Sequence, residues 1–473
     1  MSGLASVYAS PLSTDAPVLV LLLASVLAAD GARCGPLDLA TAQALVIARS
    51  DEVSIQKAQV LAAQADVAVA TSISFVPEFA LLFLGGVVPG ARLGPTATTN
   101  DITPIESGSN RGLTNLGVFG RVEVNILQPL YTFGRLSSAR DAAHAGLSAQ
   151  QDLVQDKVNA VRQQTLQLVM AATLTRRLLV IVDEIESALK DVDAKMAQSL
   201  KDNDGEVSTE DHYRLELFKS ELLQKKAEAI KAQRLARAAL ATLMVLPEAD
   251  LHLKEDPFPD PSNIEAPDIL AVRAEAEQDR PDIRALDQAI EAKRAEVHAT
   301  WAEQWPQFFI AGQFAYSRAP GRDIVSNPYV GDYFNALTLY AALGFRQNLS
   351  FFMLKAREDK ADAELDTLLR QRVGASHGVD LQVEQAHADL VAAIAKRKAA
   401  RAALAAGKSW FRSAGLNFAV GVGDAKGVVD AYTGYAKSQL DDAQSTYDVL
   451  VAQGRLNQVL GRGDPAGPAP CIP

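Results

Sequence analysis

The hydrophobic positions of this chain follow the same order twice. An apolar helical segment ends at Val76-Pro77-Glu78-Phe79, and another, in the second half of the chain, ends at Trp305-Pro306-Gln307-Phe308. Each is followed by strand-like alternation and then by two long helical stretches separated by a glycine-marked turn. The period is too long for a solenoid unit, so the pattern predicts a duplicated module.

Each copy of the module predicts a β-hairpin, at residues 76–129 and 306–349. In the first hairpin, residues 79–84 form an apolar strand, and residues 85–115, rich in Gly, Pro, Thr and Ser, form a long loop. The return strand alternates with a period of two. Its apolar face carries Leu116, Val118, Val122, Val124 and Ile126, and its other face carries Arg121, Glu123 and Asn125.

The second hairpin alternates in the same way. In its return strand Leu337, Leu339, Ala341, Leu343 and Phe345 lie on one face, and Thr338, Tyr340, Gly344 and Arg346 lie on the other. This pattern is typical of a strand with lipid on one side and water on the other. A soluble hairpin packed on helices gives the same alternation, so the strands alone do not decide between the two.

Residues 133–246 and 352–461 predict two long helical hairpins. In the first long helix apolar residues recur at intervals of four and three, and a second apolar stripe lies beside the first, which indicates a neighbouring helix on each side. About 70 residues of helix span roughly 100 Å, several times the width of a compact domain. The seam expected on the partner helix comprises Leu215, Phe218, Leu222, Ala229, Ala232, Ala236, Ala239, Leu243 and Leu246.

The turns between the long helices match one another. Gly205 permits a positive φ, and Ser208 with Asp211 predicts a capping box that opens the next helix. Gly421 and Asp424 occupy equivalent places in the second hairpin.

Other segments predict breaks in regular structure. Residues 247–279 are rich in proline and acidic residues and predict a linker, and residues 462–473 predict a disordered tail. Gly374 and Gly378 indicate a bend in the third long helix. The resulting organisation is a first repeat at 32–246, the linker, and a second repeat at 280–461.

The composition argues against several functions. A net charge of -11 on 473 residues argues against nucleic acid as a partner. The two cysteines and six histidines form no metal-binding motif, and there is neither a nucleophile–base pair nor a phosphate loop. We therefore expect no catalytic residues, no metal and no cofactor, and do not expect an enzyme.

Residues 1–31 predict a signal peptide. The apolar run from Pro17 to Ala29 has the length of a signal-peptide core and is too short to span a bilayer as a helix. No later segment reaches the roughly 18 uncharged apolar residues of a membrane-spanning helix, so contact with a membrane would be through strands. The sequence leaves open whether Cys34 carries a lipid or pairs with Cys471.

Four segments carry a resemblance to a known family. They are Gln128–Arg135 (QPLYTFGR), Arg280–Ala285 (RPDIRA), Phe345–Ser350 (FRQNLS), and the last hairpin from Val420-Gly421 to Leu460-Gly461. In this order and spacing the chain resembles the TolC-like outer-membrane efflux proteins over nearly all of its mature length.

The resemblance implies a mainly α fold with a small β part. Each chain would give four strands to a 12-stranded transmembrane β-barrel and its long helices to an α-helical barrel that continues the channel. It also implies a homotrimer in outer-membrane lipid, whereas the sequence by itself also allows a dimer. The trimer would work with a periplasmic adaptor, or membrane fusion protein, and with an inner-membrane pump of the RND, ABC or MFS type.

The resemblance also suggests functional residues. Asp211 and Asp430 match family aspartates at the pore constriction and gate; the alternative is a solvated or capping carboxylate. Gly427 and Gly423 replace a second aspartate and a basic partner, so the family's gate network is incomplete here. Adaptor docking falls on the tip residues Asp204, Gly205, Glu206, Val420 and Gly421, and the residues expected in the barrel lumen are Arg121, Glu123, Thr338, Tyr340 and Arg346.

These observations predict a passive exit duct in the outer membrane of a Gram-negative bacterium, extending into the periplasm, in a tripartite efflux or type I secretion system. The alternative is a soluble coiled-coil scaffold protein of the cell envelope, which would not need strands with a lipid-type face. The sequence leaves the substrate open, because a lumen selects by width and charge.

Overall fold

The computed structural model describes residues 37–90, 116–202, 208–254, 260–324, 331–420, 422–423 and 425–463. The expected signal peptide, Cys34, Cys471, the tail from residue 464, and the tip residues Asp204, Gly205, Glu206 and Gly421 lie outside these ranges. Two compact units are formed, one by the described parts of residues 1–54, 157–276 and 381–473, the other by residues 55–156 and 277–380. Each unit therefore combines segments from both sequence repeats.

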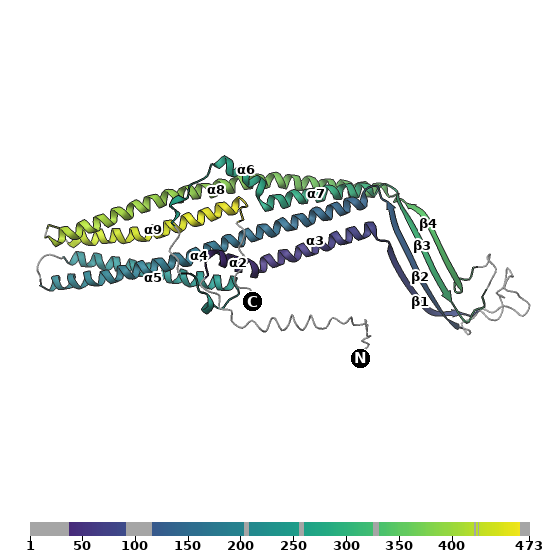
Figure 1. Ribbon diagram of the computed structural model, residues 1–473, viewed down its shortest axis with the longest axis horizontal. Helices are drawn as coiled ribbons and strands as arrows, with labels where there is room; N and C mark the ends of the chain where they lie inside the picture. Colours follow the sequence, from purple (N-terminus) through teal and green to yellow (C-terminus); the bar gives the residue numbers. More distant parts are fainter. Residues whose placement is uncertain are drawn as a thin grey trace, which may run out of the picture. The chain divides into compact units, whose positions relative to one another are not determined.

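The second unit contains one antiparallel sheet in the order β1-β2-β3-β4 (Figure 1). Its strands are β1 (Glu78–Pro89), β2 (Leu116–Tyr131), β3 (Gln307–Arg318) and β4 (Ala336–Arg346). β2 and β3, from different halves of the chain, pair in the centre and join the two hairpins into one sheet.

The first strand is longer than the sequence predicts. β1 does not end at Leu84 but continues to Pro89, with Gly85 opposite Gly120 and Gly86 opposite Phe119. Two adjacent glycines are typical of a loop, because glycine weakens an isolated strand. Here the long partner strand β2 supplies the ladder hydrogen bonds that keep them extended.

The helices of the second unit lead into the strands (Figure 1). They are α3 (Asp51–Phe75), α7 (Pro281–Ala302), the first part of α4 (Arg135–Asp202) and the first part of α8 (Phe351–Ala419). α8 continues as one helix through Gly374 and Gly378, so neither glycine ends it, and the bend stays a prediction. A glycine inside a helix costs only about 1 kcal/mol, which packing along a long helix outweighs.

α7 begins at a charged clamp. Arg280 Nε and Nη2 donate to the two carboxylate oxygens of Asp282 at 3.0 and 2.7 Å, and Pro281 occupies the first turn. Burial raises the pKa of Asp282, but the hydrogen bonds and charge of Arg280 outweigh this effect, so the net pKa is lowered.

The first unit is helical and contains two hydrophobic clusters. Its elements are α2 (Leu39–Arg49), α5 (Thr209–Leu243), η1 (Glu248–Asp250), η2 (Pro261–Asn263), α6 (Ile269–Asp279), α9 (Ala425–Val459) and the remaining parts of α4 and α8. One cluster joins α2, α4 and α5, and the other joins α4, α5 and α9. The long-period apolar stripes of the sequence are therefore helix-packing surfaces.

The buried positions follow the expected seams with one local error. On α4, Val161, Thr165 and Val182 are buried, and all three belong to the stripe that recurs at intervals of four and three. On α5, Ala232 is exposed, whereas Leu240 and Ala241 are buried. A strict heptad drifts by about 20° per repeat relative to a straight helix, so the contact face moves to the next row over several turns.

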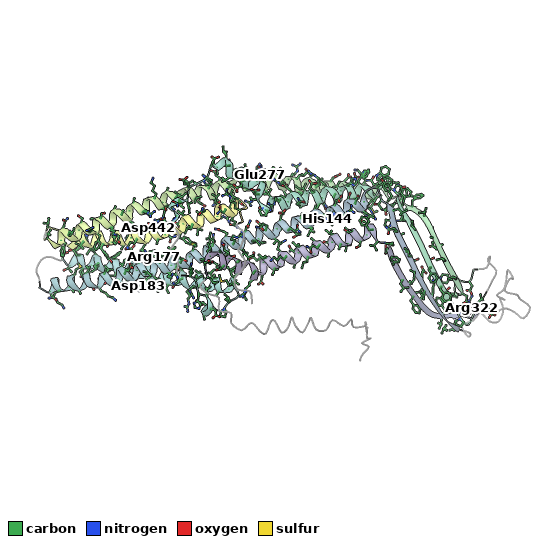
Figure 2. The ribbon with its side chains drawn as sticks, in the orientation of Figure 1. His144, Arg177, Asp183, Glu277, Arg322 and Asp442 are labelled. Carbon is green, nitrogen blue, oxygen red and sulfur yellow. The ribbon has the colours of Figure 1, made fainter. Side chains whose placement is uncertain are left out.

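Ion pairs between helices accompany the apolar contacts. Lys226 of α5 lies 2.9 Å from Asp183 and 2.7 Å from Glu186, both on α4, and Arg397 of α8 pairs with Asp442 of α9. Figure 2 labels Asp183 and Asp442 on their helices. Because Lys226 and Asp183 are partly exposed, such pairs contribute little free energy and mainly favour one pairing of the helices.

The segment expected as a linker contains short structured elements. It includes η1, η2 and the whole of α6, and a parallel bridge joins Leu253 to Leu37. Val272 and Ala276 of α6 are buried. The proline-rich stretch therefore separates short structured elements.

Among the described residues, two helices have the length and composition of a membrane-crossing helix: α3 and residues 135–198 of α4. The most apolar stretch of α3 has no buried residues, whereas 44% of the most apolar stretch of α4 is buried within the chain. Long core helices satisfy the same criteria, so these two features by themselves carry little weight.

Candidate pore-lining and gating residues

All five residues expected in the barrel lumen lie on one face of the sheet. Glu123 is opposite Ala315, which is opposite Thr338, and Asn125 is opposite Gln313, which is opposite Tyr340. Directly opposed residues share a face, and residues two apart along a strand do too. Arg121 and Arg346 therefore fall on this face with Glu123, Thr338 and Tyr340.

A polar network occupies the centre of this face. Arg121 Nε and Nη2 donate to Glu123 Oε2 at 3.0 and 2.8 Å, and Glu123 Oε1 accepts from Asn125 at 2.9 Å and from Gln313 at 2.6 Å. The Arg121 guanidinium also lies 4.5 Å from the ring centroid of Tyr333. Both carboxylate oxygens thus have charged or amide donors.

The sequence predicted Arg121 and Glu123 but not their partners Gln313 and Tyr333. Gln313 shows a usable signal, because it interrupts an apolar strand on the polar side of the alternation. Tyr333 precedes β4 and has no periodic signal.

The opposite face of the sheet is apolar and open. Leu339 is 78% exposed, Leu343 77% and Leu81 73%. The same face carries Phe79, Phe83, Val87, Val118, Phe314, Leu337 and Phe345, all exposed. A continuous apolar surface of this kind is unusual for a soluble monomer and indicates contact with lipid or another protein.

Aromatic side chains gather where the strands meet the helices. Phe133 stacks on Trp305 with 5.4 Å between centroids and lies 4.8 Å from Tyr131. Gly134 has a φ of +91°, and a Cβ there would lie 2.7 Å from His298 Cε1. Glycine is therefore required at this junction by both the backbone and the packing.

Asp211 is the N3 residue of a capping box at the start of α5. Its Oδ2 accepts from the Ser208 backbone N–H at 3.2 Å and from the Ser208 hydroxyl at 2.6 Å, and its own N–H donates to Ser208 Oγ at 3.1 Å. The predicted capping box is confirmed. The carboxylate thus has a structural role, and its assignment to a gate stays a prediction.

Asp430 is exposed on α9 and faces α5 across a groove of about 450 Å³. Arg214 of α5 lines the same groove, and Glu210, Asp430 and Asp211 raise the pKa of Arg214, Glu210 most through a 3.0 Å hydrogen bond. The family resemblance places the basic partner of the gate at position 423, where this chain has a glycine. The fold places Arg214 near Asp430 instead.

Val420 is 71% exposed and directly follows α8. The N–H groups of Val422 and Gly423 both donate to Asn417 O, at 2.9 and 3.0 Å, which closes the helix end. Among the described residues no group of three or more His, Cys, Asp or Glu is placed to hold a metal ion.

Residues 272–462 match the family model described as outer membrane efflux protein. Comparison with curated proteins found no matching sequence. The solved structure of the outer-membrane channel OprN matches with a TM-score of 0.72 and 16% identity over 90% of each chain. The fold is that of the TolC-like outer-membrane efflux proteins.

Two further channels share this fold. The CmeC outer membrane channel of Campylobacter jejuni matches with a TM-score of 0.68 and 12% identity, over 98% of this chain and 96% of that one. The open state of the Neisseria gonorrhoeae MtrE outer membrane channel matches with a TM-score of 0.64 and 17% sequence identity. The match covers 89% of this chain and 88% of that one. The resemblance to the TolC-like family and its fold class are thereby confirmed.

Proposed function

We propose that three copies of this chain form a passive outer-membrane exit duct of a tripartite efflux or type I secretion system. The observation that carries the proposal is the sheet, which has an open apolar face, a polar face and two unpaired edges. The match to an outer membrane efflux family supports the same function.

The edges of the sheet support assembly. In the described chain β1 and β4 each pair on one side only. An open edge is not tolerated in the hydrocarbon of a bilayer, because its backbone groups would lack hydrogen-bond partners. Pairing β4 of one copy with β1 of the next removes every edge, and three copies give the 12 strands of a barrel of ordinary width.

The two faces of the sheet indicate which face would lie on the outside of the barrel and which on the inside. Leucine and phenylalanine would face lipid, and the network around Arg121 and Glu123 would face the water-filled lumen. The aromatic cluster of Tyr131, Phe133 and Trp305 lies at the strand ends, where aromatic girdles of such barrels meet the membrane surface.

Exposed apolar side chains on the helices support the proposal that helices of other copies pack beside them. Ile55, Leu61 and Val69 of α3 are 60, 66 and 58% exposed, and Leu217 and Leu235 of α5 are 73 and 66% exposed. In a ring of helices each would pack on the adjacent chain. A periplasmic adaptor and an inner-membrane pump would supply direction and energy, since the chain shows no nucleotide-binding motif.

The test is purification from outer membranes, native mass measurement in detergent and single-channel recording. A trimer with a stable conductance is expected, and Asp430→Ala is expected to change cation block or conductance while the trimer persists. A monomer that needs no detergent and binds no lipid would refute the channel and favour a soluble scaffold. An unchanged conductance in the variant would refute only the role of Asp430.

A further inference from the structure

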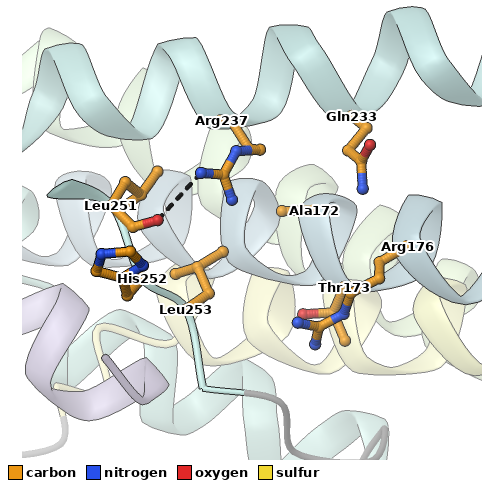
Figure 3. Close-up of a pocket in the computed structure, with 8 residues that line it drawn as sticks. All are labelled: Ala172, Thr173, Arg176, Gln233, Arg237, Leu251, His252 and Leu253. Atoms are coloured by element: carbon orange, nitrogen blue, oxygen red, sulfur yellow. Dashed lines mark hydrogen bonds between the residues drawn. The ribbon is translucent and has the colours of Figure 1, made fainter. Parts of the chain in front are cut away.

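A basic pocket opens in the first unit between α4, α5 and the segment 251–253 (Figure 3). Its volume is about 240 Å³. It is lined by Ala172, Thr173, Arg176, Gln233, Arg237, Leu251, His252 and Leu253. No lining residue is acidic, although the whole chain has a net charge of -11. The concentration of positive charge is therefore local.

The walls of the pocket are fixed by hydrogen bonds. Arg237 Nη2 donates to the carbonyl oxygen of Leu251 at 3.0 Å, the dashed line in Figure 3. The neighbouring backbone is held by Leu37, whose N–H donates to His252 O at 2.7 Å and whose carbonyl accepts from Lys254 N–H at 2.9 Å. A ligand entering this pocket would not have to order the loop, which lowers the cost of binding.

The donors around the pocket are not all used within the chain. Figure 3 shows Gln233 reaching from α5 toward α4, and the guanidinium of Arg176 beside Thr173. Among the described residues, the side chain of Arg176 has neither an ion pair nor a hydrogen bond. Arg237 is partly neutralised by Glu248, 3.9 Å from its Nε.

We propose that this pocket binds a small oxyanion, a phosphate, sulfate or carboxylate group, between Arg176 and Arg237. Guanidinium groups present paired N–H donors that match such anions. The Gln233 amide adds a neutral donor. The apolar side of the pocket, with Leu253, leaves room for a short carbon skeleton attached to the anionic group.

The experiment uses the purified full-length protein in detergent and does not depend on channel function. Sodium sulfate, sodium phosphate and sodium succinate are titrated separately at constant ionic strength set with sodium chloride, and binding is measured by calorimetry. Saturable binding of at least one probe is expected. The three arms distinguish a preference for tetrahedral anions from one for carboxylates.

Arg176→Gln is expected to weaken binding at least tenfold, because it removes the guanidinium that has no partner of its own. For the same reason its unfolding midpoint without anion should equal that of the wild type. Arg177→Gln is the matched control, since Arg177 is the next residue, is exposed and does not line the pocket (Figure 2). It should bind as the wild type does.

Gln233→Leu provides a second variant of similar volume and should weaken binding by several-fold. Absence of saturable binding for all three probes would overturn the proposal. Equal affinity of Arg176→Gln and the wild type would overturn it as well, and so would an equal loss in Arg177→Gln, which would indicate a general charge effect.

Discussion

Two neighbouring residues of β4 allow the orientation of the sheet to be tested. Leu339 is on the apolar face and is 78% exposed, and Thr338 is on the polar face beside Ala315. We expect Leu339→Arg to prevent stable insertion and Thr338→Arg to be tolerated. The two variants introduce the same side chain at neighbouring positions, on opposite faces of the strand.

The magnitude follows from the proposed environment. An arginine on the lipid face of a barrel costs about 2–4 kcal/mol near the bilayer midplane and about 0–1 kcal/mol near the interface. Since Leu339 is opposite Phe314, well inside both strands, the larger value applies. A loss of about 2–4 kcal/mol corresponds to a roughly 30- to 1000-fold smaller folding equilibrium constant per copy.

The assay is folding into lipid vesicles, followed by urea titration, with the fraction of detergent-resistant oligomer in outer membranes as a second measure. Leu339→Arg should shift the urea midpoint strongly downward. Thr338→Arg should keep the midpoint near that of the wild type and change conductance or ion selectivity. If Leu339→Arg folds as the wild type does while Thr338→Arg fails, the faces are assigned the wrong way round. If neither has an effect, the strands are not in lipid.

Three further predictions concern the helical parts. Gly454→Ala should lower the midpoint of thermal unfolding, because the added Cβ would lie 2.1 Å from Leu166 Cδ2. Gly374→Ala should raise the midpoint, because its Cβ would meet open space and alanine is favoured over glycine in a helix by about 1 kcal/mol. Equal shifts in the two variants would contradict this packing. Asp282→Asn should destabilise the protein at neutral pH. The difference in stability from the wild type should vanish as the pH falls through the lowered pKa of Asp282, because the carboxylate contributes to stability only above that pKa. A pH series of urea titrations measures this, and a difference that does not depend on pH would argue against the clamp. Ser208→Ala should cost about 0.5–2 kcal/mol in urea titrations by removing the cap of α5; an unchanged midpoint would show that this helix end contributes no stability.

The sequence determined the local features of this protein. The faces of β2 and β4, the buried stripe of α4 and the Ser208–Asp211 capping box were all predictable, because each depends on residues within a few positions of one another. The periodicity of apolar residues indicates which side of a helix or strand is apolar, whatever element packs against it.

Only the tertiary structure decided how distant segments combine. Gly85 and Gly86 are extended because β2 pairs with them, and Arg214 lies near Asp430 because α5 packs beside α9. The basic pocket likewise depends on α4, α5 and the segment around Leu251 meeting in one place. Such relations depend on the register between elements, which is set by the summed packing of many side chains and leaves no signal at any single position.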